Sequence, residues 1–247
     1  MRSSALAVLL FLLSFQVNSS DLVFYTQEFA PFNYSENGDV KGPAKAVIET
    51  VCQAASLSCS FKALPWGRAQ SDVKSGEAHG LFVIGWNEGR AKWLHYSPPL
   101  MTTEYGFFVH SDDLDKISSL DDFNSRTVGV FGPSNTSKSL EKLQKSLTSM
   151  KISMTADDIA GFKKLEAKRV DAVFSNREVG LDMVKKLGLK NVKYVMKQRE
   201  LNYFIGLSKE FTDQELVDRF NGKFTELYET GEIPTVLKSF NMQPVGN

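Results

Sequence analysis

The segment Gly132-Pro133-Ser134-Asn135-Thr136 lies between a predicted strand and a predicted helix, and it contains residue types that can bind an anion. Backbone N–H groups at the start of a helix point outward and attract negative charge. The hydroxyl groups of Ser134 and Thr136 and the side-chain amide of Asn135 would add hydrogen bonds. The same residue types also cap helices, so the segment predicts helix capping, anion binding, or both.

Catalytic groups do not gather anywhere in the sequence. The three histidines, His79, His95 and His110, are scattered and match no triad or metal-ligand spacing, and His79 opens a strand, where a structural role is expected. The G-x-S-x-G, H-E-x-x-H and P-loop patterns are absent. One catalytic Asp or Glu stays open as an alternative. We predict a binding protein without metal or cofactor, and not an enzyme.

Charge and length narrow the class of partner. The chain has 247 residues, which allows one large or two small domains. Its 29 basic and 29 acidic residues balance, whereas a nucleic-acid-binding protein normally carries a basic excess. We therefore expect a small molecule or a protein as partner, and no nucleic acid.

The first residues predict export. Arg2 precedes an apolar run at 5–15, and polar residues follow it, which is the pattern of a cleaved secretory signal peptide over residues 1–19. The run is too short for an ordinary membrane span, although an uncleaved anchor is the alternative. Two nearby cysteines in an exported protein commonly pair, so we predict a disulfide between Cys52 and Cys59 in preference to two buried thiols.

Alternating strands and helices predict an α/β protein in two blocks. Strands are expected at 22–25, 59–64, 79–85, 126–131, 170–174 and 192–196. Helices are expected at 43–55, 66–75, 137–149, 157–168, 178–187 and 234–240. In the fourth of these helices, Ile159, Phe162 and Leu165 should face inward. A capping box at Thr212 and Glu215 should open one further, long helix.

Apolar runs at 105–109 and 203–207 predict two strands that cross between the blocks. The chain would then leave the first block and return to it later. The predicted division is a first lobe of residues 20–106 and 204–247 and a second lobe of residues 107–203.

Motifs spread over nearly the whole mature chain carry a family resemblance. They are Phe29-Ala30-Pro31-Phe32, Gly76-Glu77-Ala78-His79-Gly80 (like G-x-x-D-G, with His for Asp), Arg90-Ala91-Lys92-Trp93-Leu94-His95-Tyr96-Ser97-Pro98, Lys168-Arg169-Val170-Asp171-Ala172-Val173 and Glu229-Thr230-Gly231. Their order and spacing resemble the bacterial periplasmic solute-binding proteins of family 3, the polar amino-acid-binding components of ABC transporters. Pro65-Trp66-Gly67-Arg68-Ala69 resembles the P-W-x-R-A motif of one branch.

The resemblance implies a type II, two-lobed periplasmic-binding-protein-like fold. Each lobe would be a mixed, mainly parallel sheet flanked by helices, and two hinge strands would join the lobes around a ligand cleft. Some basic-amino-acid binders of the family also carry a disulfide at the Cys52–Cys59 spacing.

The resemblance also implies a ligand site. Arg90 matches the carboxylate-binding arginine, Trp66 and Phe29 match aromatic positions around the ligand, and Arg68 would be a second cation at the cleft mouth. The alternatives are a surface ion pair for Arg90, core packing for the two rings and a solvated helix position for Arg68. Val83, Ile84 and Gly85 replace the serines that usually precede the arginine.

A second departure from the family pattern bears on the ligand. Asn176 stands where amino-acid binders carry the aspartate that holds the α-ammonium group. Glu104 or Glu28 could replace that carboxylate. We therefore predict a ligand that keeps an anionic group but need not carry an α-ammonium group.

The implied function is capture of a small polar solute in the periplasm, by a monomer, for delivery to an ABC transporter permease. One alternative is a sensor or orphan binding module that signals to a membrane receptor. The other is an enzyme on the same fold, resembling cyclohexadienyl dehydratase.

Overall fold

The computed structural model describes residues 21–147 and 149–246. The predicted signal peptide, residues 1–19, lies outside the described residues and stays a prediction. Among the described helices, none has the length and apolar character that crossing a lipid bilayer would need.

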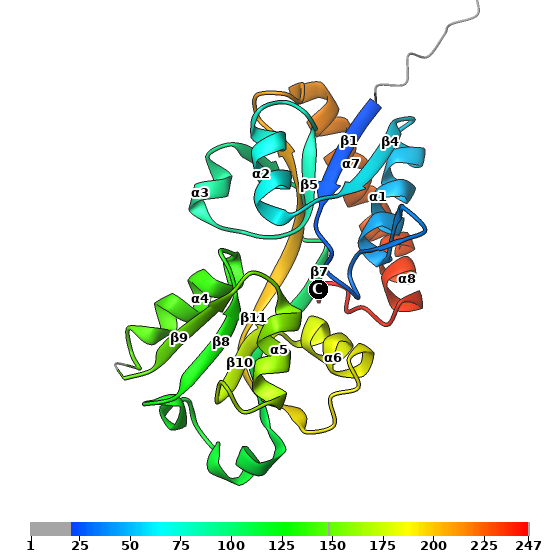
Figure 1. The fold of residues 1–247 in the computed structure, drawn as a ribbon. Coiled ribbons are helices and arrows are strands. Elements are labelled where there is room, and N and C mark those ends of the chain that lie inside the picture. The colour runs from blue at the N-terminus through cyan, green and yellow to red at the C-terminus, as the bar shows by residue number, and fades with distance from the viewer. Residues whose placement is uncertain (1–20, 148, 247) are drawn as a thin grey trace, which may run out of the picture.

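Within the described residues, one nine-stranded sheet runs through both ends of the molecule (Figure 1). Its main path is β4-β1-β5-β11-β7-β10-β8-β9, and β6 pairs with β11. These strands are β1 (Asp21–Thr26), β4 (Ser58–Ala63), β5 (Gly80–Gly85), β6 (Leu94–Tyr96), β7 (Met101–His110), β8 (Thr127–Phe131), β9 (Lys151–Thr155), β10 (Ala172–Asn176) and β11 (Val192–Ser208). The short strands β2 (Tyr34–Glu36) and β3 (Asp39–Lys41) form a separate antiparallel pair.

Strand pairing is parallel toward both ends of the sheet and antiparallel in the middle. Strand β1 pairs in parallel with β4 and β5, and β8 pairs in parallel with β9 and β10. Strand β11 is antiparallel to β5 and β7, and β7 is antiparallel to β10. This is the mixed α/β architecture that the sequence predicts, although the described strands of this sheet form as many antiparallel as parallel pairs.

Helices gather in two groups around the two ends of the sheet (Figure 1). The helices are α1 (Pro43–Ala54), α2 (Trp66–Lys74), α3 (Glu88–Ala91), α4 (Asn135–Gln144), α5 (Asp158–Glu166), α6 (Arg177–Lys186), α7 (Gln214–Glu229) and α8 (Glu232–Ser239), with 3-10 turns at Ser111–Lys116 and Leu120–Phe123. Figure 1 shows α4, α5 and α6 at one end and the other helices at the opposite end. Each end has its own apolar core, one containing Phe24, Phe220 and Phe224, the other containing Phe107 and Phe174.

The two groups are joined by β7 and β11, which pair from Val192 opposite His110 to Tyr203 opposite Met101. The sequence predicts only short apolar pieces of these strands. Residues 197–202 of β11 are polar or partly exposed, so the hydrogen-bonded ladder with β7 keeps them extended without an apolar pattern. The lobe boundaries at residues 106/107 and 203/204 stay a prediction.

Helix α4 begins two residues before the predicted start because Ser134 caps it. The Ser134 hydroxyl accepts a hydrogen bond from the backbone N–H of Ser137 at 3.0 Å. The helix ends at Gln144, so the prediction that it extends to residue 149 was wrong. Strands β6 and β9 were not predicted, since both are short and carry too few apolar residues for a clear pattern.

Two other local predictions were wrong. Ile159 is 42% exposed, whereas Phe162 and Leu165 are fully buried. At 100° per residue, Ile159 lies about 120° around α5 from Leu165, outside the inward face. Helix α7 starts after Asp213 with no side-chain cap, and the Thr212 hydroxyl instead donates to the carbonyl oxygen of His79 at 3.2 Å.

The predicted disulfide is confirmed. Cys52, late in α1, and Cys59, early in β4, are bonded, with their Cα atoms 6.2 Å apart. Residues 55–57 form the turn that brings the end of the helix back to the strand. The bridge therefore fixes α1 against the sheet edge that β4 forms with β1.

Candidate functional site

Arg90 occupies the centre of the candidate site. The preceding strand β5 ends at Gly85, and Asn87 caps the one-turn helix α3 by accepting a hydrogen bond from the backbone N–H of Arg90 at 2.9 Å. This turn folds the guanidinium back over the end of β5. One guanidinium nitrogen donates to the Gly85 carbonyl oxygen at 3.0 Å and the other to Gln70 Oε1 at 3.3 Å.

The guanidinium is buried without a counter-charge. Only 7% of Arg90 is exposed, and among the described residues no carboxylate forms an ion pair with it. The Trp66 ring centroid lies 5.0 Å from the guanidinium carbon, a favourable cation–π position. Burial lowers the pKa of Arg90 below its ordinary value, and the phenol of Tyr96 partly offsets that shift. A buried cation of this kind is strongly stabilised by an anion that it can contact.

A small cavity of about 30 Å³, here called the inner cavity, lies beside Arg90 and Gly85. Its remaining lining comes from both groups of elements: Gln27, Phe29, Trp66, Val83, Tyr105, Phe131, Ser134, Asn135, Thr136 and Tyr203. The volume is about that of one water molecule, or of the end of one carboxylate. A whole solute must therefore extend into an adjoining space.

The start of α4 forms the wall opposite Arg90. The Ser134 hydroxyl caps α4 and donates to the Phe131 carbonyl oxygen at 2.8 Å. The side-chain nitrogen of Asn135 is buried and has no hydrogen-bond partner. It packs against the end of β5, where a Cβ atom added to Gly85 would lie 2.3 Å from it. The segment thus caps its helix and also places an unused donor beside Gly85, in the lining of the inner cavity.

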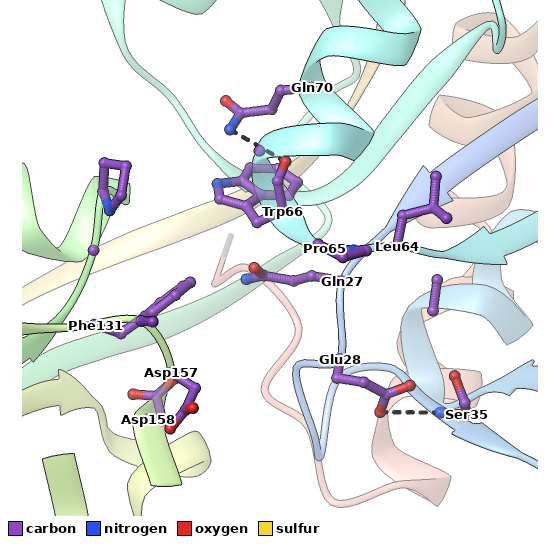
Figure 2. A pocket seen from close by; sticks show the side chains of 15 residues that line it. Gln27, Glu28, Ser35, Leu64, Pro65, Trp66, Gln70, Phe131, Asp157 and Asp158 are labelled. Carbon is purple, nitrogen blue, oxygen red and sulfur yellow. Dashed lines mark hydrogen bonds between the residues drawn. The ribbon is translucent and has the colours of Figure 1, made fainter. Parts of the chain in front are cut away.

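A larger space of about 620 Å³, here called the outer chamber, adjoins the inner cavity and shares Gln27, Trp66 and Phe131 with it. Figure 2 shows Trp66 on one side of this chamber and Phe131 across from it, with Gln27 between them.

Carboxylates line the outer chamber. Glu28, Asp157 and Asp158 belong to its wall, and no Lys, Arg or His of the described residues does. Figure 2 shows Asp157 and Asp158 near Phe131, and Glu28 apart from them, accepting a hydrogen bond from the backbone N–H of Ser35 at 3.1 Å. Burial raises the pKa of Asp158 to about 6, against the lowering effect of a hydrogen bond from Ser175. The outer chamber therefore disfavours the binding of a negatively charged group.

Most of the predicted site residues come together around the inner cavity. Arg90, Trp66, Phe29, Gly85, Ser134, Asn135 and Thr136 all line it. Phe29 also packs against the buried rings of Phe32 and Tyr203, with centroids 5.6 and 5.9 Å away, so this ring serves both the cavity and the core.

Three predicted residues lie elsewhere. Arg68 is exposed and pairs with Asp72 at 3.3 Å. Glu104 accepts a hydrogen bond from the Tyr194 hydroxyl at 2.8 Å and lies 3.5 Å from Arg177. Neither the inner cavity nor the outer chamber has Arg68, Glu104 or Asn176 among its described lining residues.

Asn176 is 1% exposed and already fully engaged. Its amide nitrogen donates to Thr103 Oγ1 at 2.6 Å and to the Tyr203 hydroxyl at 3.1 Å, and its oxygen accepts from the backbone N–H of Val179 at 3.1 Å, which caps α6. These bonds tie α6 to the two crossing strands. Asn176, at the position where an aspartate would bind the α-ammonium group, therefore has a structural role.

The sequence analysis missed several lining residues, among them Gln27, Tyr105, Phe131 and Tyr203. Strand alternation could have found Tyr105. Successive side chains of a strand point to opposite faces, so Tyr105 faces the inner cavity while its neighbour Glu104 faces Tyr194. Val83, one of the residues that replace the usual serines, also lines the inner cavity, and its φ of 55° is unusual for a β-branched residue.

The histidines take no part in these cavities. The Nδ1 atom of His79 accepts a hydrogen bond from the backbone N–H of Val23 at 3.0 Å, which supports the structural role predicted for it. His110 is buried and accepts from the backbone N–H of Asp112 at 3.3 Å. Among the described residues, no group of His, Cys, Asp and Glu could hold a metal ion.

Comparison with known proteins identifies a family and a relative. The family model described as bacterial extracellular solute-binding proteins, family 3, matches residues 22–243. The arginine-binding periplasmic protein of Mannheimia haemolytica is 24% identical over 234 residues, which are 92% of this chain and 93% of the relative.

Solved structures with the same fold include a histidine kinase sensor domain similar to periplasmic binding proteins, with a TM-score of 0.81 and 19% identity over 92% of this chain and 99% of that chain. An ancestral arginine-binding protein bound to arginine has a TM-score of 0.79 and 24% identity over 90% of this chain and 98% of that chain.

Proposed function

The chain belongs to the bacterial extracellular solute-binding proteins of family 3, and from this premise we propose that it captures a small solute whose carboxylate contacts Arg90. The inner cavity receives the carboxylate, and the rest of the solute lies in the adjoining space. Arg90, Trp66, Gly85 and Asn135 are the residues proposed to make the main contacts.

The single observation that carries this proposal is the buried guanidinium that has no anionic partner among the described residues. Two of its N–H groups hold Gly85 and Gln70, which orients the fork and leaves the remaining N–H groups for a ligand. Guanidinium groups match carboxylates in a planar, two-point geometry, and the low-polarity wall from Trp66 strengthens the attraction.

Donors approach the inner cavity from both groups of elements. Arg90 comes from α3, and the unpaired amide nitrogen of Asn135 comes from α4. An anion between them would contact both, and that contact would favour the arrangement in which the two groups are close. A ligand shifts such an equilibrium by its differential affinity for the closed state.

An α-ammonium group lacks a counterpart here. No Asp or Glu of the described residues lines the inner cavity, and Asn176 and Glu104 are engaged elsewhere. A charge-assisted hydrogen bond contributes roughly 1.5–3 kcal/mol, and an ammonium group in this cavity would forgo it. The proposed solute therefore needs a carboxylate and does not need an α-amino group.

We further propose that the mature protein works in the periplasm as a monomer and delivers its solute to an ABC transporter permease. The family membership and the predicted signal peptide support this role. The alternative is a sensor that signals to a membrane receptor. The similarity in fold to a histidine kinase sensor domain supports this alternative. The dehydratase alternative would require a positioned acid or base at the solute. Among the described residues no His, Asp or Glu lines the inner cavity, whereas Glu28, Asp157 and Asp158 line the outer chamber.

Calorimetry tests the proposal. The mature protein would be titrated with amino acids, including arginine, and with organic acids that lack an amino group. We expect micromolar or tighter binding of at least one organic acid and a loss of at least tenfold in Arg90→Gln. The matched control is Arg68→Gln, an exposed arginine outside the cavities, which should bind normally. Tight binding of a free amino acid that survives Arg90→Ala would overturn the proposal.

A further inference from the structure

Arg90 also lines a second adjoining space, here called the lateral pocket, which has a volume of about 260 Å³. The inner cavity and the lateral pocket share Trp66, Arg90, Ser134 and Asn135. A solute whose carboxylate rests on Arg90 therefore has two directions in which to extend, toward the outer chamber or toward the lateral pocket.

The lining of the lateral pocket is cationic. Lys74, Arg90 and Lys138 belong to it, and no Asp or Glu of the described residues does. Its other polar side chains are neutral and include three with amide groups that can donate hydrogen bonds, Gln70, Asn87 and Asn135. Three positive charges without a negative one favour an anionic occupant.

Within the described part of the chain, these cations have no internal counter-charges. None of the lysine and arginine side chains that form ion pairs there is Lys74, Arg90 or Lys138. The Lys74 ammonium lies 5.1 Å from the centroid of the Trp93 ring, a contact that leaves its charge available. The unpaired state of the two lysines is informative because they share one pocket with the buried Arg90.

The two lysines come from opposite walls. Lys74 lies at the end of α2, and Lys138 lies in the first turns of α4, near the positive end of that helix. Asn135 also lines this pocket, and its side-chain nitrogen is buried and has no hydrogen-bond partner. An anionic group in the lateral pocket would satisfy this donor and would neutralise charges from both walls.

The outer chamber has the opposite character, because its charged side chains are the carboxylates Glu28, Asp157 and Asp158. A negative group would be repelled there and attracted to the lateral pocket. From this contrast we infer that the solute is a dianion, such as a small dicarboxylate, with one anionic group on Arg90 and the second in the lateral pocket between Lys74 and Lys138. The inference rests on the proposed function for the Arg90 contact and adds the second contact.

Calorimetry on matched pairs of acids tests the inference. Malonate, succinate, glutarate and adipate vary the spacing between two carboxylates, and propanoate, butanoate, pentanoate and hexanoate are the corresponding monoanions. We expect one dianion to bind at least tenfold more tightly than its monoanion at low salt. That preference should shrink toward about 0.5 M salt, since exposed lysines are screened at this ionic strength.

Variants locate the second anionic group. Lys74→Gln and Lys138→Gln should each weaken the preferred dianion by about two- to fivefold, as expected for exposed charges, and the double variant by about tenfold. Monoanion binding should stay within twofold in all three variants. Lys142→Gln is the matched control, because Lys142 is on the same helix and does not line the lateral pocket.

The results separate this inference from the proposed function. If monoanions bind through Arg90 and no dianion binds better, the lateral subsite is refuted and the proposed function stands. The subsite is refuted in the same way if Lys142→Gln weakens the dianion as much as Lys138→Gln, since the effect would then be one of overall charge. If no acid of either series binds, both the inference and the proposed function fail for these solutes.

Discussion

Replacing Arg90 by lysine keeps the positive charge and removes the planar fork. The guanidinium has five N–H donors, and it gives one to the Gly85 carbonyl and one to Gln70. Three donors remain for a carboxylate, enough for a two-point contact. A lysine ammonium has three donors in all, so after the same two internal bonds only one would remain.

The substitution should therefore remove one of two charge-assisted hydrogen bonds to the ligand. Such a bond contributes roughly 1.5–3 kcal/mol. Because about 1.4 kcal/mol corresponds to a factor of ten, we expect Arg90→Lys to weaken carboxylate binding about ten- to hundredfold. Calorimetry with the tightest-binding acid measures this loss.

Thermal unfolding followed by circular dichroism is the necessary control. The Arg90→Lys protein without ligand should unfold within a few degrees of the wild type, since the charge and most of the buried stem are kept. Affinity within twofold of the wild type, in a protein that is equally stable, would refute the view that the fork holds the ligand. A large loss of stability would show instead that Arg90 mainly supports the fold.

Three further perturbations probe the site and its frame. Reducing the Cys52–Cys59 bond, or replacing both residues by alanine, should lower the free energy of unfolding by about 2–3 kcal/mol, as expected for a loop this short, in denaturant titrations. The pKa of Asp158 is raised to about 6, so its ionisation opposes folding as the pH rises from about 4 to 6; Asp158→Asn should gain stability relative to the wild type over that range, by about 1–3 kcal/mol at pH 7. An equal difference between the two proteins at pH 4 and pH 7 would contradict this. Gly85→Ala should weaken ligand binding several-fold with little change in stability, because the new Cβ would lie 2.3 Å from the Asn135 amide nitrogen and force that amide away. Unchanged affinity would show that the amide moves aside without cost to binding.

Much of the fold can be predicted from the sequence, because the spacing of apolar residues reflects which positions are buried. The run at 22–25 gives β1, and the fully buried run at 80–85 gives β5, as expected for strands covered on both faces. The pattern fails where burial is partial. Strand β9 has an exposed and partly buried face, and the middle of β11 is held by its ladder with β7, so neither has an apolar signal.

The candidate site can be predicted from the sequence only where a motif contains the site residue. Arg90 and Trp66 could be located because each belongs to a motif that resembles one of the family, Arg90 in the motif at 90–98 and Trp66 in the motif at 65–69. The pairing of Arg90 with the Gly85 carbonyl, and the free amide of Asn135 opposite it, depend on how the two ends of the sheet approach each other in space. The engagement of Asn176 with Thr103 and Tyr203 likewise joins residues that are 73 and 27 positions apart. Contacts between residues so far apart in the chain produce no pattern in the local sequence.

Native mass spectrometry of the mature protein, taken directly from gentle purification, addresses the role of Arg90 most directly. The expected spectrum shows a complex with one small acid, and the Arg90→Gln protein, equally folded, shows only the unliganded mass. A cation, a sugar or another uncharged solute in place of the acid, or the same acid retained by Arg90→Gln, would contradict the assignment of Arg90 as the anion-binding group.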